Sequence, residues 1–125
     1  MASEKSEISE AELEIMKVLW AAGEAVDTKA IGQAVAHKGW KRTTVSTLLA
    51  RLVEKGAVRC TKQGNTYFYA PLIPAREYRK RQTKGLIQRL YNGSIREFAV
   101  ALFEDEVFSE EEIAQLKDLF DGREA

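Results

Sequence analysis

The clearest hydrophobic pattern lies over residues 43–55, which read TTVSTLLARLVEK and are followed by Gly56. Their apolar positions recur at i, i+3, i+4, i+7 and i+8, the spacing of one buried face of a helix. The pattern therefore predicts a helix that ends before Gly56. The residues expected on its buried face are Val45, Leu48, Leu49, Leu52 and Val53.

Hydroxyl side chains gather on the opposite face of this helix, near its start. A helix start offers unpaired N–H groups and the positive end of the helix dipole, and short hydroxyl groups beside it can bond phosphate oxygens or base edges. This arrangement favours contact with DNA. The alternative is that the hydroxyl groups cap the helix or are simply solvated. The residues concerned are Thr43, Thr44, Ser46, Thr47 and Arg51.

Two shorter helices are expected before this segment. Ser9 and Glu12 form the S-x-x-E pattern of a capping box, so a helix is predicted over residues 9–22, ended by Gly23. Asp27 is the expected N-cap of a second helix that runs to about residue 37, before Gly39. The predicted apolar positions are Ile8, Leu13, Met16, Leu19 and Trp20 for the first helix, and Ala30, Ile31, Ala34 and Val35 for the second.

Two β-prone runs, residues 58–62 and 66–70, flank a Gly-Asn tip and predict a hairpin. Two helices joined by a tight turn and followed by a hairpin are typical of a winged helix-turn-helix. At the tip, Lys62, Gln63 and Asn65 are candidates for contact with a sugar-phosphate backbone, although an ordinary polar turn explains them equally well.

Only helices are expected in the second half of the chain. Pro74 is well placed to start a helix that runs to about Asn92, and S-x-x-E patterns at Ser94 and Ser109 start two more. Three short helices have too few residues to close a core, so we expect a homodimer; the alternative is that they fold back on the first half. The expected dimerisation residues are Tyr78, Leu86, Ile87, Leu90, Tyr91, Ile95, Phe98, Ala99, Leu102, Phe103, Ile113, Leu116, Leu119 and Phe120.

The predicted fold class is therefore mainly α, with a winged helix-turn-helix domain over residues 1–72 and a helical dimerisation domain over residues 73–125.

The charged residues are unevenly distributed along the chain, although the 19 basic and 19 acidic residues cancel in total. Residues 24–70 carry eight Lys or Arg against three Asp or Glu, residues 71–96 carry seven against one, and residues 97–125 carry two against ten. Basic segments favour phosphate partners, and an acidic tail favours pairing between chains or self-screening.

Several kinds of chemistry find no support in the sequence. Cys60 is the only cysteine, which excludes an intramolecular disulfide and a multi-cysteine metal site; we expect a small core residue rather than a redox switch. His37 is the only histidine, and no catalytic set surrounds it, so we expect no enzyme, no metal and no cofactor. The acidic run at residues 110–112 fits the first turn of a helix.

The polar start MASEKSEISE does not resemble a signal peptide, and no apolar run approaches the roughly 18 residues that span a bilayer. We therefore expect a soluble, cytoplasmic protein.

The run GWKRTTVSTLLARLVEKGAVRCTKQGNTYFYAP, the YNGS segment and the later FSEEEIAQL together resemble the penicillinase repressor (BlaI/MecI) family of bacterial transcription regulators. The resemblance extends from the Ser9 helix to Phe120. It implies a homodimer that represses transcription by occupying a palindromic operator in double-stranded DNA. It also implies that Thr44 and Thr47 match the recognition-helix threonines of the family, whereas Thr43 and Ser46 depart from its common residues.

The resemblance also sets limits on how repression is lifted. Resistance-associated members are cut at an Asn-Phe bond, and the matching pair here is Leu102-Phe103, so a membrane sensor-protease partner is unsupported. Copper-responsive members carry paired Cys-x-Cys motifs, which are missing from this sequence.

The hypothesis is that each recognition helix enters a major groove while Lys41, Arg42, Arg51 and the wing neutralise the DNA backbone. The run Arg76, Arg79, Lys80, Arg81 and Lys84 is interpreted as a further DNA contact, a solvated face or a surface that pairs with acidic residues of a partner chain. The alternative function is a winged helix that docks another protein without binding DNA, which the basic residues 24–70 disfavour.

Overall fold

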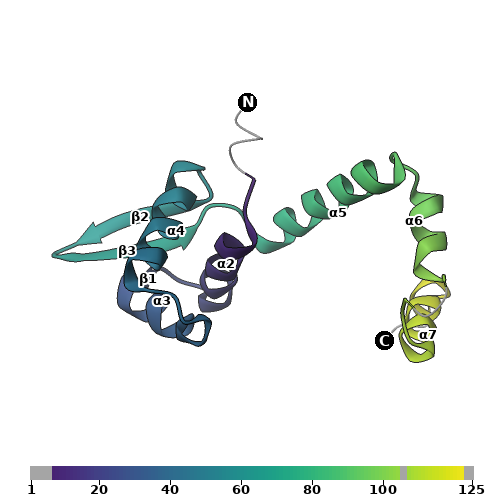
Figure 1. Ribbon diagram of the computed structural model, residues 1–125, viewed down its shortest axis with the longest axis horizontal. Helices are drawn as coiled ribbons and strands as arrows, with labels where there is room; N and C mark the ends of the chain where they lie inside the picture. Colours follow the sequence, from purple (N-terminus) through teal and green to yellow (C-terminus); the bar gives the residue numbers. More distant parts are fainter. Residues whose placement is uncertain (1–6, 105–106, 123–125) are drawn as a thin grey trace. The chain divides into compact units, whose positions relative to one another are not determined.

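The structure, a computed structural model, describes residues 7–104 and 107–122, so the first six residues of the polar start lie outside the described part. Its contacts divide the chain into two compact units, Met1–Tyr78 and Arg79–Ala125. In chain order the first unit contains α2 (Glu10–Ala22), β1 (Val26–Asp27), α3 (Thr28–Ala34), the 3-10 turn η1 (Ala36–Lys38), α4 (Arg42–Glu54), β2 (Val58–Gln63) and β3 (Thr66–Pro71) (Figure 1).

The start of α2 confirms the predicted capping box. The Ser9 side chain accepts a hydrogen bond from Glu12 N at 3.2 Å, and the Ser9 N–H donates to Glu12 Oε1 at 2.9 Å. At the other end, Gly23 adopts the left-handed conformation that closes the helix, with φ 73°. Asp27 also caps α3 as predicted, since its side chain accepts from Ala30 N. Local sequence signals therefore set where these helices begin.

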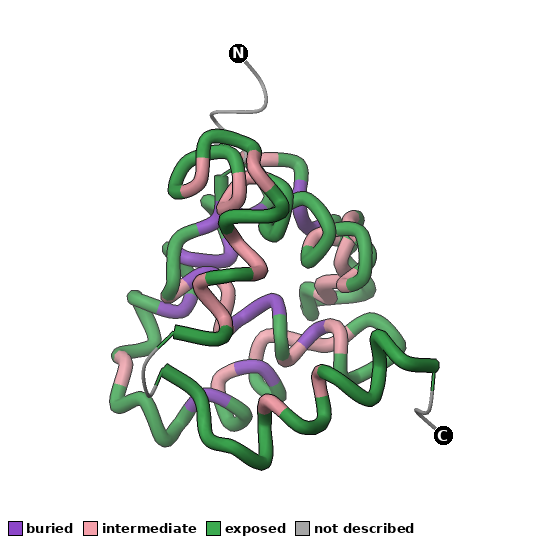
Figure 2. Tube along the Cα trace, turned by 90° about the vertical axis from the view of Figure 1, so that its right-hand side faces the viewer, coloured by how far each residue is buried: buried purple, intermediate pink, exposed green. Residues whose placement is uncertain are grey.

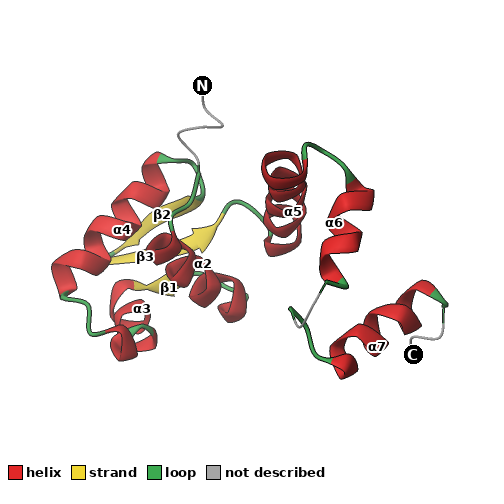
Figure 3. Ribbon diagram, turned by 45° about the vertical axis from the view of Figure 1, so that its right-hand side comes forward, coloured by secondary structure: helices red, strands yellow, loops and turns green. Residues whose placement is uncertain are grey.

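The predicted hairpin forms, and it belongs to a sheet of three antiparallel strands in the order β1-β3-β2 (Figure 3). Val58 pairs with Pro71, and Gln63 pairs with Thr66 next to the turn. The third strand, β1, was not expected; Val26 pairs with Tyr69 and Asp27 with Phe68. Because β1 is only two residues long, it carries no alternation that a sequence could reveal.

Buried residues of the first unit pack into one apolar cluster, and Figure 2 marks the buried positions along the chain in purple. The indole N–H of Trp20 donates to the Ile73 carbonyl at 2.8 Å, and its ring lies 5.6 Å from the ring of Tyr78. Through these contacts Ile73 and Tyr78, which both belong to the first unit, pack against α2. The buried apolar residues are Ile8, Ile15, Met16, Leu19, Ile31, Val35, Val45, Leu48, Leu49, Leu52, Ala57 and Val58.

Some predicted core positions were wrong. Ala30 and Ala34 of α3 are exposed, and Val53 of α4 is 38% exposed. The second helix ends at Ala34 rather than near His37, because the chain tightens into η1 before Gly39. Ala30, Ala34 and Val53 each lie at the margin of an apolar stripe, and a single small domain covers only the centre of such a stripe.

Cys60 is half-buried on β2 and pairs with Tyr69 of β3, while its neighbour on the same face, Val58, is fully buried. Burial, and then the adjacent Cys60, raise the pKa of Tyr69. The sheet thus holds Cys60 at the edge of the core rather than inside it.

The second unit is helical, as expected. The helices of this part of the chain are α5 (Ala75–Tyr91), which begins in the first unit, α6 (Ile95–Leu102) and α7 (Glu110–Phe120). Ser94 accepts from Glu97 N, but the complete capping box forms at Ser109, where Glu112 also bonds the Ser109 N–H. Among the helices in the described ranges, none combines the length and the apolar character needed to cross a membrane.

Candidate nucleic-acid interface

Helix α4 divides into a buried face and an exposed face. Val45, Leu48, Leu49 and Leu52 are at most 6% exposed, which confirms four of the five predicted core positions. At about 100° per residue, these four side chains centre on one side of the helix. The opposite side is exposed over its whole length. Its predicted DNA-contacting residues, Thr43, Thr44, Ser46, Thr47 and Arg51, are all exposed.

The start of α4 does not support the alternative that the hydroxyl groups cap this helix. The helix begins at Arg42, and the N-cap residue is Lys41, whose side chain makes no capping hydrogen bond. Thr43 and Thr44 therefore lie inside the first turn. A first turn without a side-chain cap keeps its N–H groups available, and such groups bind anionic oxygens well.

Ala50 was missed as a candidate in the sequence. It lies two turns beyond Thr43 and one turn beyond Thr47, so its methyl group shares the centre of the exposed face with the two hydroxyl groups. A small apolar side chain at such a position can contact the methyl group of thymine. The helical spacing already places Ala50 on the exposed face, but alanine has no polar group that would mark it as a candidate for DNA contact.

Cations flank the exposed face of α4. Lys41, Arg42 and Arg51 are exposed. In the described ranges, the ion pairs of the first unit are formed by Lys17, Lys38 and Lys55 instead. The three flanking cations therefore form no ion pair with the described residues.

The tip of the hairpin is exposed at each predicted position, Lys62, Gln63 and Asn65. Gly64 forms the turn with φ 62°, a conformation that glycine adopts without strain. The ammonium group of Lys62 lies 5.4 Å from the centroid of the Tyr67 ring, a cation–π contact. The wing therefore presents a cation whose position is partly set by the neighbouring strand.

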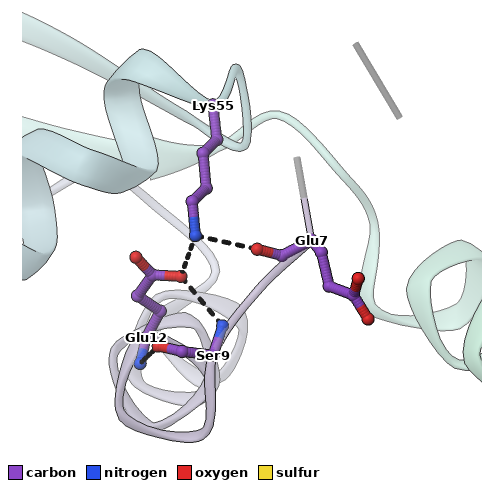
Figure 4. Close-up of polar contacts among 4 residues, drawn as sticks. All are labelled: Glu7, Ser9, Glu12 and Lys55. Atoms are coloured by element: carbon purple, nitrogen blue, oxygen red, sulfur yellow. Dashed lines mark hydrogen bonds and ion pairs between the residues drawn. The ribbon is translucent and has the colours of Figure 1, made fainter. Parts of the chain in front are cut away.

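A buried ion pair attaches the far end of α4 to the start of α2 (Figure 4). Lys55, the C-cap residue of α4, donates to Glu12 Oε1 at 2.5 Å and to the Glu7 carbonyl at 2.8 Å. Burial raises the pKa of Glu12, but the bonds from Lys55 and from the Ser9 N–H outweigh that effect and hold the pKa below its ordinary value. This contact holds the C-terminal end of α4, whereas most of the candidate DNA-contacting residues lie near its N-terminal end.

A cavity of about 620 Å³ opens beside the start of α4. Trp40 and Arg42 line it from one side, and Thr28 and Lys29, at the start of α3, line it from another. The cavity extends the surface next to the first turn of α4 and adds Lys29 to the cations of this region. Neither Trp40 nor Lys29 is among the residues that the sequence predicted to contact DNA.

Tyr78, predicted as a dimerisation residue, packs instead against the core of the first unit, and the other predicted dimerisation residues are not buried in the described part of their own chain. No residue of the described part of the second unit is buried. Leu90, Ile95 and Phe120 are each at least 65% exposed. The clearest contact among the predicted positions is the edge-to-face packing of Tyr91 on Phe98, with ring centroids 5.7 Å apart.

Comparison with known proteins gives concordant results. The family model for the penicillinase repressor matches residues 8–122. The chain is 33% identical to the penicillinase repressor of Bacillus licheniformis over 110 residues, 88% of this chain and 86% of the relative. It is 27% identical to the methicillin resistance regulatory protein MecI of Staphylococcus aureus strain N315, over 98% of this chain and 100% of that protein.

Two solved structures resemble the first unit. The DNA-binding domain of the repressor BlaI in solution matches with TM-score 0.52 and 36% identity. The monomeric form of Bacillus licheniformis BlaI in complex with the blaP half-operator matches with TM-score 0.50 and 36% identity. Each covers 58% of this chain and 88% of the solved chain.

Proposed function

The chain belongs to the penicillinase repressor family, and from that premise we propose that it represses transcription by binding an operator duplex as a homodimer. The observation that carries this proposal is the two-sided character of α4. Its apolar face is held in the core, and its other face presents hydroxyl groups flanked by three cations that form no ion pair in the described ranges. The solved complex of BlaI with a half-operator, similar over the first unit, supports the same role for this unit.

In this proposal α4 lies in the major groove. Thr43, Thr47 and Ala50 face the bases, and Thr44 and Ser46 lie at the sides of the helix, within reach of bases or phosphates. The remaining contacts are electrostatic and do not depend on sequence. They come from Lys41, Arg42, Arg51 and the wing residues Lys62, Gln63 and Asn65.

Dimerisation follows from the exposed apolar surface of the second unit. Within the described ranges, α5, α6 and α7 make no extensive contacts with one another, and each leaves large apolar side chains in solvent. Such a surface in a unit this small is typical of helices that complete their core with a second chain. Two-fold symmetry would place two α4 helices on half-sites about 10 base pairs apart, or a multiple of that distance.

The direct test compares Thr47→Ala and Thr44→Ala with Gln82→Ala, an exposed polar residue of α5 outside the proposed DNA interface. An operator sequence is first selected from random DNA with the wild-type chain. Loss of one hydroxyl hydrogen bond should then reduce the preference for operator over random duplex on the order of fivefold. Thr47→Ala should have the larger effect, because Thr47 lies nearer the centre of the exposed face.

Gln82→Ala should leave the preference unchanged. If both α4 variants discriminate as well as the wild type, the assignment of base readout to these threonines is wrong. A second candidate function, docking of another protein by the winged helix, is separated by a simpler assay. A docking module would fail to retard a random duplex in dilute buffer, whereas the proposed repressor would bind it.

The same proposal places the protein in the cytoplasm with its DNA and assigns it no catalytic step, in line with its relatives being repressors. Leu102 and Phe103 lie at the end of α6, and Phe103 is its C-cap residue. Since the asparagine of the cleaved family members is replaced by Leu102, the proposal does not include release by cleavage at this bond.

A further inference from the structure

One face of α5 is basic in its first half and apolar in its second half. At about 100° per residue, eight exposed or half-buried side chains fall within roughly 140° of the helix circumference; four are basic, three are apolar and the eighth is Thr83. We name this set the α5 stripe. Its basic members are Arg76, Arg79, Lys80 and Lys84, and its apolar members are Ile87, Leu90 and Tyr91.

The stripe is separate from the side of α5 that carries Tyr78, a residue that packs within the first unit. Tyr78 lies about 160° around the helix from Lys80, and its ring packs 5.6 Å from the ring of Trp20. Glu77 and Arg81 also lie outside the stripe. All four basic members are exposed, and none of them forms an ion pair in the described part of the chain.

A surface of matching charge exists at the start of α7. Glu110, Glu111 and Glu112 form its first turn, and Glu112 is already bound to the Ser109 N–H at 2.9 Å. Glu110 and Glu111 are exposed, and neither forms an ion pair with another residue in the described ranges. Helices α5 and α7 of one chain make no extensive contact with each other in the described residues, so the basic members of the stripe are not paired there with Glu110 or Glu111.

We propose that the α5 stripe of one subunit docks against the acidic first turn of α7 in a second copy of this chain. The inference rests on the proposed homodimer. The apolar end of the stripe, at Ile87 and Leu90, suits a protein partner and not a duplex, and the basic end continues the same face of the same rigid helix. Two-fold symmetry doubles the contact, so the basic end of each subunit meets the acidic turn of the other.

The test uses the full-length chain and measures the dimer dissociation constant by analytical ultracentrifugation. Reversing Arg79 and Lys80 together to Glu should raise this constant on the order of tenfold at low salt, because each changed residue acts twice. Adding Glu110→Lys and Glu111→Lys to the same chain should restore most of the affinity. The wild-type constant should itself rise between about 50 mM and 500 mM NaCl as screening increases.

The matched control is Arg89→Glu, a change of the same charge on the same helix outside the stripe. It should leave the constant near the wild-type value, and circular dichroism should show equal helix content in all variants. Equal dissociation constants for wild type, Arg79→Glu/Lys80→Glu and Arg89→Glu would overturn the inference while the dimer itself stands. An unchanged constant with weakened binding to random duplex would assign the stripe to DNA. A wild-type chain that stays monomeric would instead overturn the proposed dimer.

Discussion

Replacing Lys55 by Met should destabilise the protein far more than a typical lysine substitution on its surface. The Glu12 side chain is 2% exposed and the Lys55 side chain 22% exposed. Met keeps most of the aliphatic length of Lys55 but removes the ammonium group, so Glu12 retains only the Ser9 N–H as a hydrogen-bond donor. A carboxylate would then remain buried without its counter-charge.

Breaking a buried pair by removing one partner costs about 3–5 kcal/mol. We expect the lower end, about 3 kcal/mol, because Lys55 is partly reached by water and because Glu12 can take up a proton in the variant. That is a large share of the roughly 5–15 kcal/mol by which folded domains are stable. The matched control is Lys17→Met, since Lys17 pairs with Glu14 at 3.4 Å with its own side chain 60% exposed. An exposed pair of this kind contributes about 0–1 kcal/mol.

The effect should depend on pH in a defined direction. The pKa of Glu12 is held below its ordinary value of 4.5, so its paired form stabilises the wild type above that pH and the stabilisation is lost as the pH falls through the lowered pKa. Without Lys55, burial dominates and should raise the pKa of Glu12 above 4.5. The difference in unfolding free energy between wild type and Lys55→Met should therefore be largest near neutral pH and shrink in acid.

The assay is urea unfolding of the full chain, followed by circular dichroism at one fixed protein concentration because unfolding is coupled to dimerisation. It is run near pH 7 and near pH 4. A cost for Lys55→Met no greater than that for Lys17→Met, or a cost that grows on acidification, would refute the reasoning.

Two further predictions concern the ends of helices. Ser9→Ala removes the cap of α2 and should lower the unfolding free energy by about 1 kcal/mol, seen as a lower urea midpoint; Ser94→Ala, where the capping box is incomplete, should cost less. Lys41→Ala should weaken binding to operator and random duplex alike and make the slope of log K against log salt shallower by about 0.9 for one lost phosphate contact. An unchanged slope in gel retardation would remove Lys41 from the interface.

Local signals in the sequence identified most of the elements. The capping residues Ser9, Asp27 and Ser109 each begin the helix predicted for them. These features were predictable because a cap and a helical stripe act over three to eight residues, a distance that a sequence pattern reports directly. The exposed face of α4 was predictable for the same reason, since a buried stripe defines the opposite face.

Contacts between distant residues were not predictable. Glu12 was recognised as half of a capping box, but its second role, as the buried partner of a lysine 43 positions away, has no signature in the sequence. The two-residue strand β1 exists only because β3 offers it an edge. Ala30, Ala34 and Val53 were predicted to be buried because periodicity marks a stripe but not how wide a neighbour will cover it.

The sequence by itself thus determined where helices start and stop, which face of α4 is apolar, and that hydroxyl groups and cations gather on the other. Only the tertiary structure decided that Lys41 leaves the first turn of α4 without a side-chain cap and that Lys55 is bound to Glu12. It also decided that Leu90, Ile95 and Phe120 stay largely exposed within the described chain. The physical reason is range: propensity and capping act between neighbours in the sequence, whereas burial depends on which surfaces the folded chain brings together.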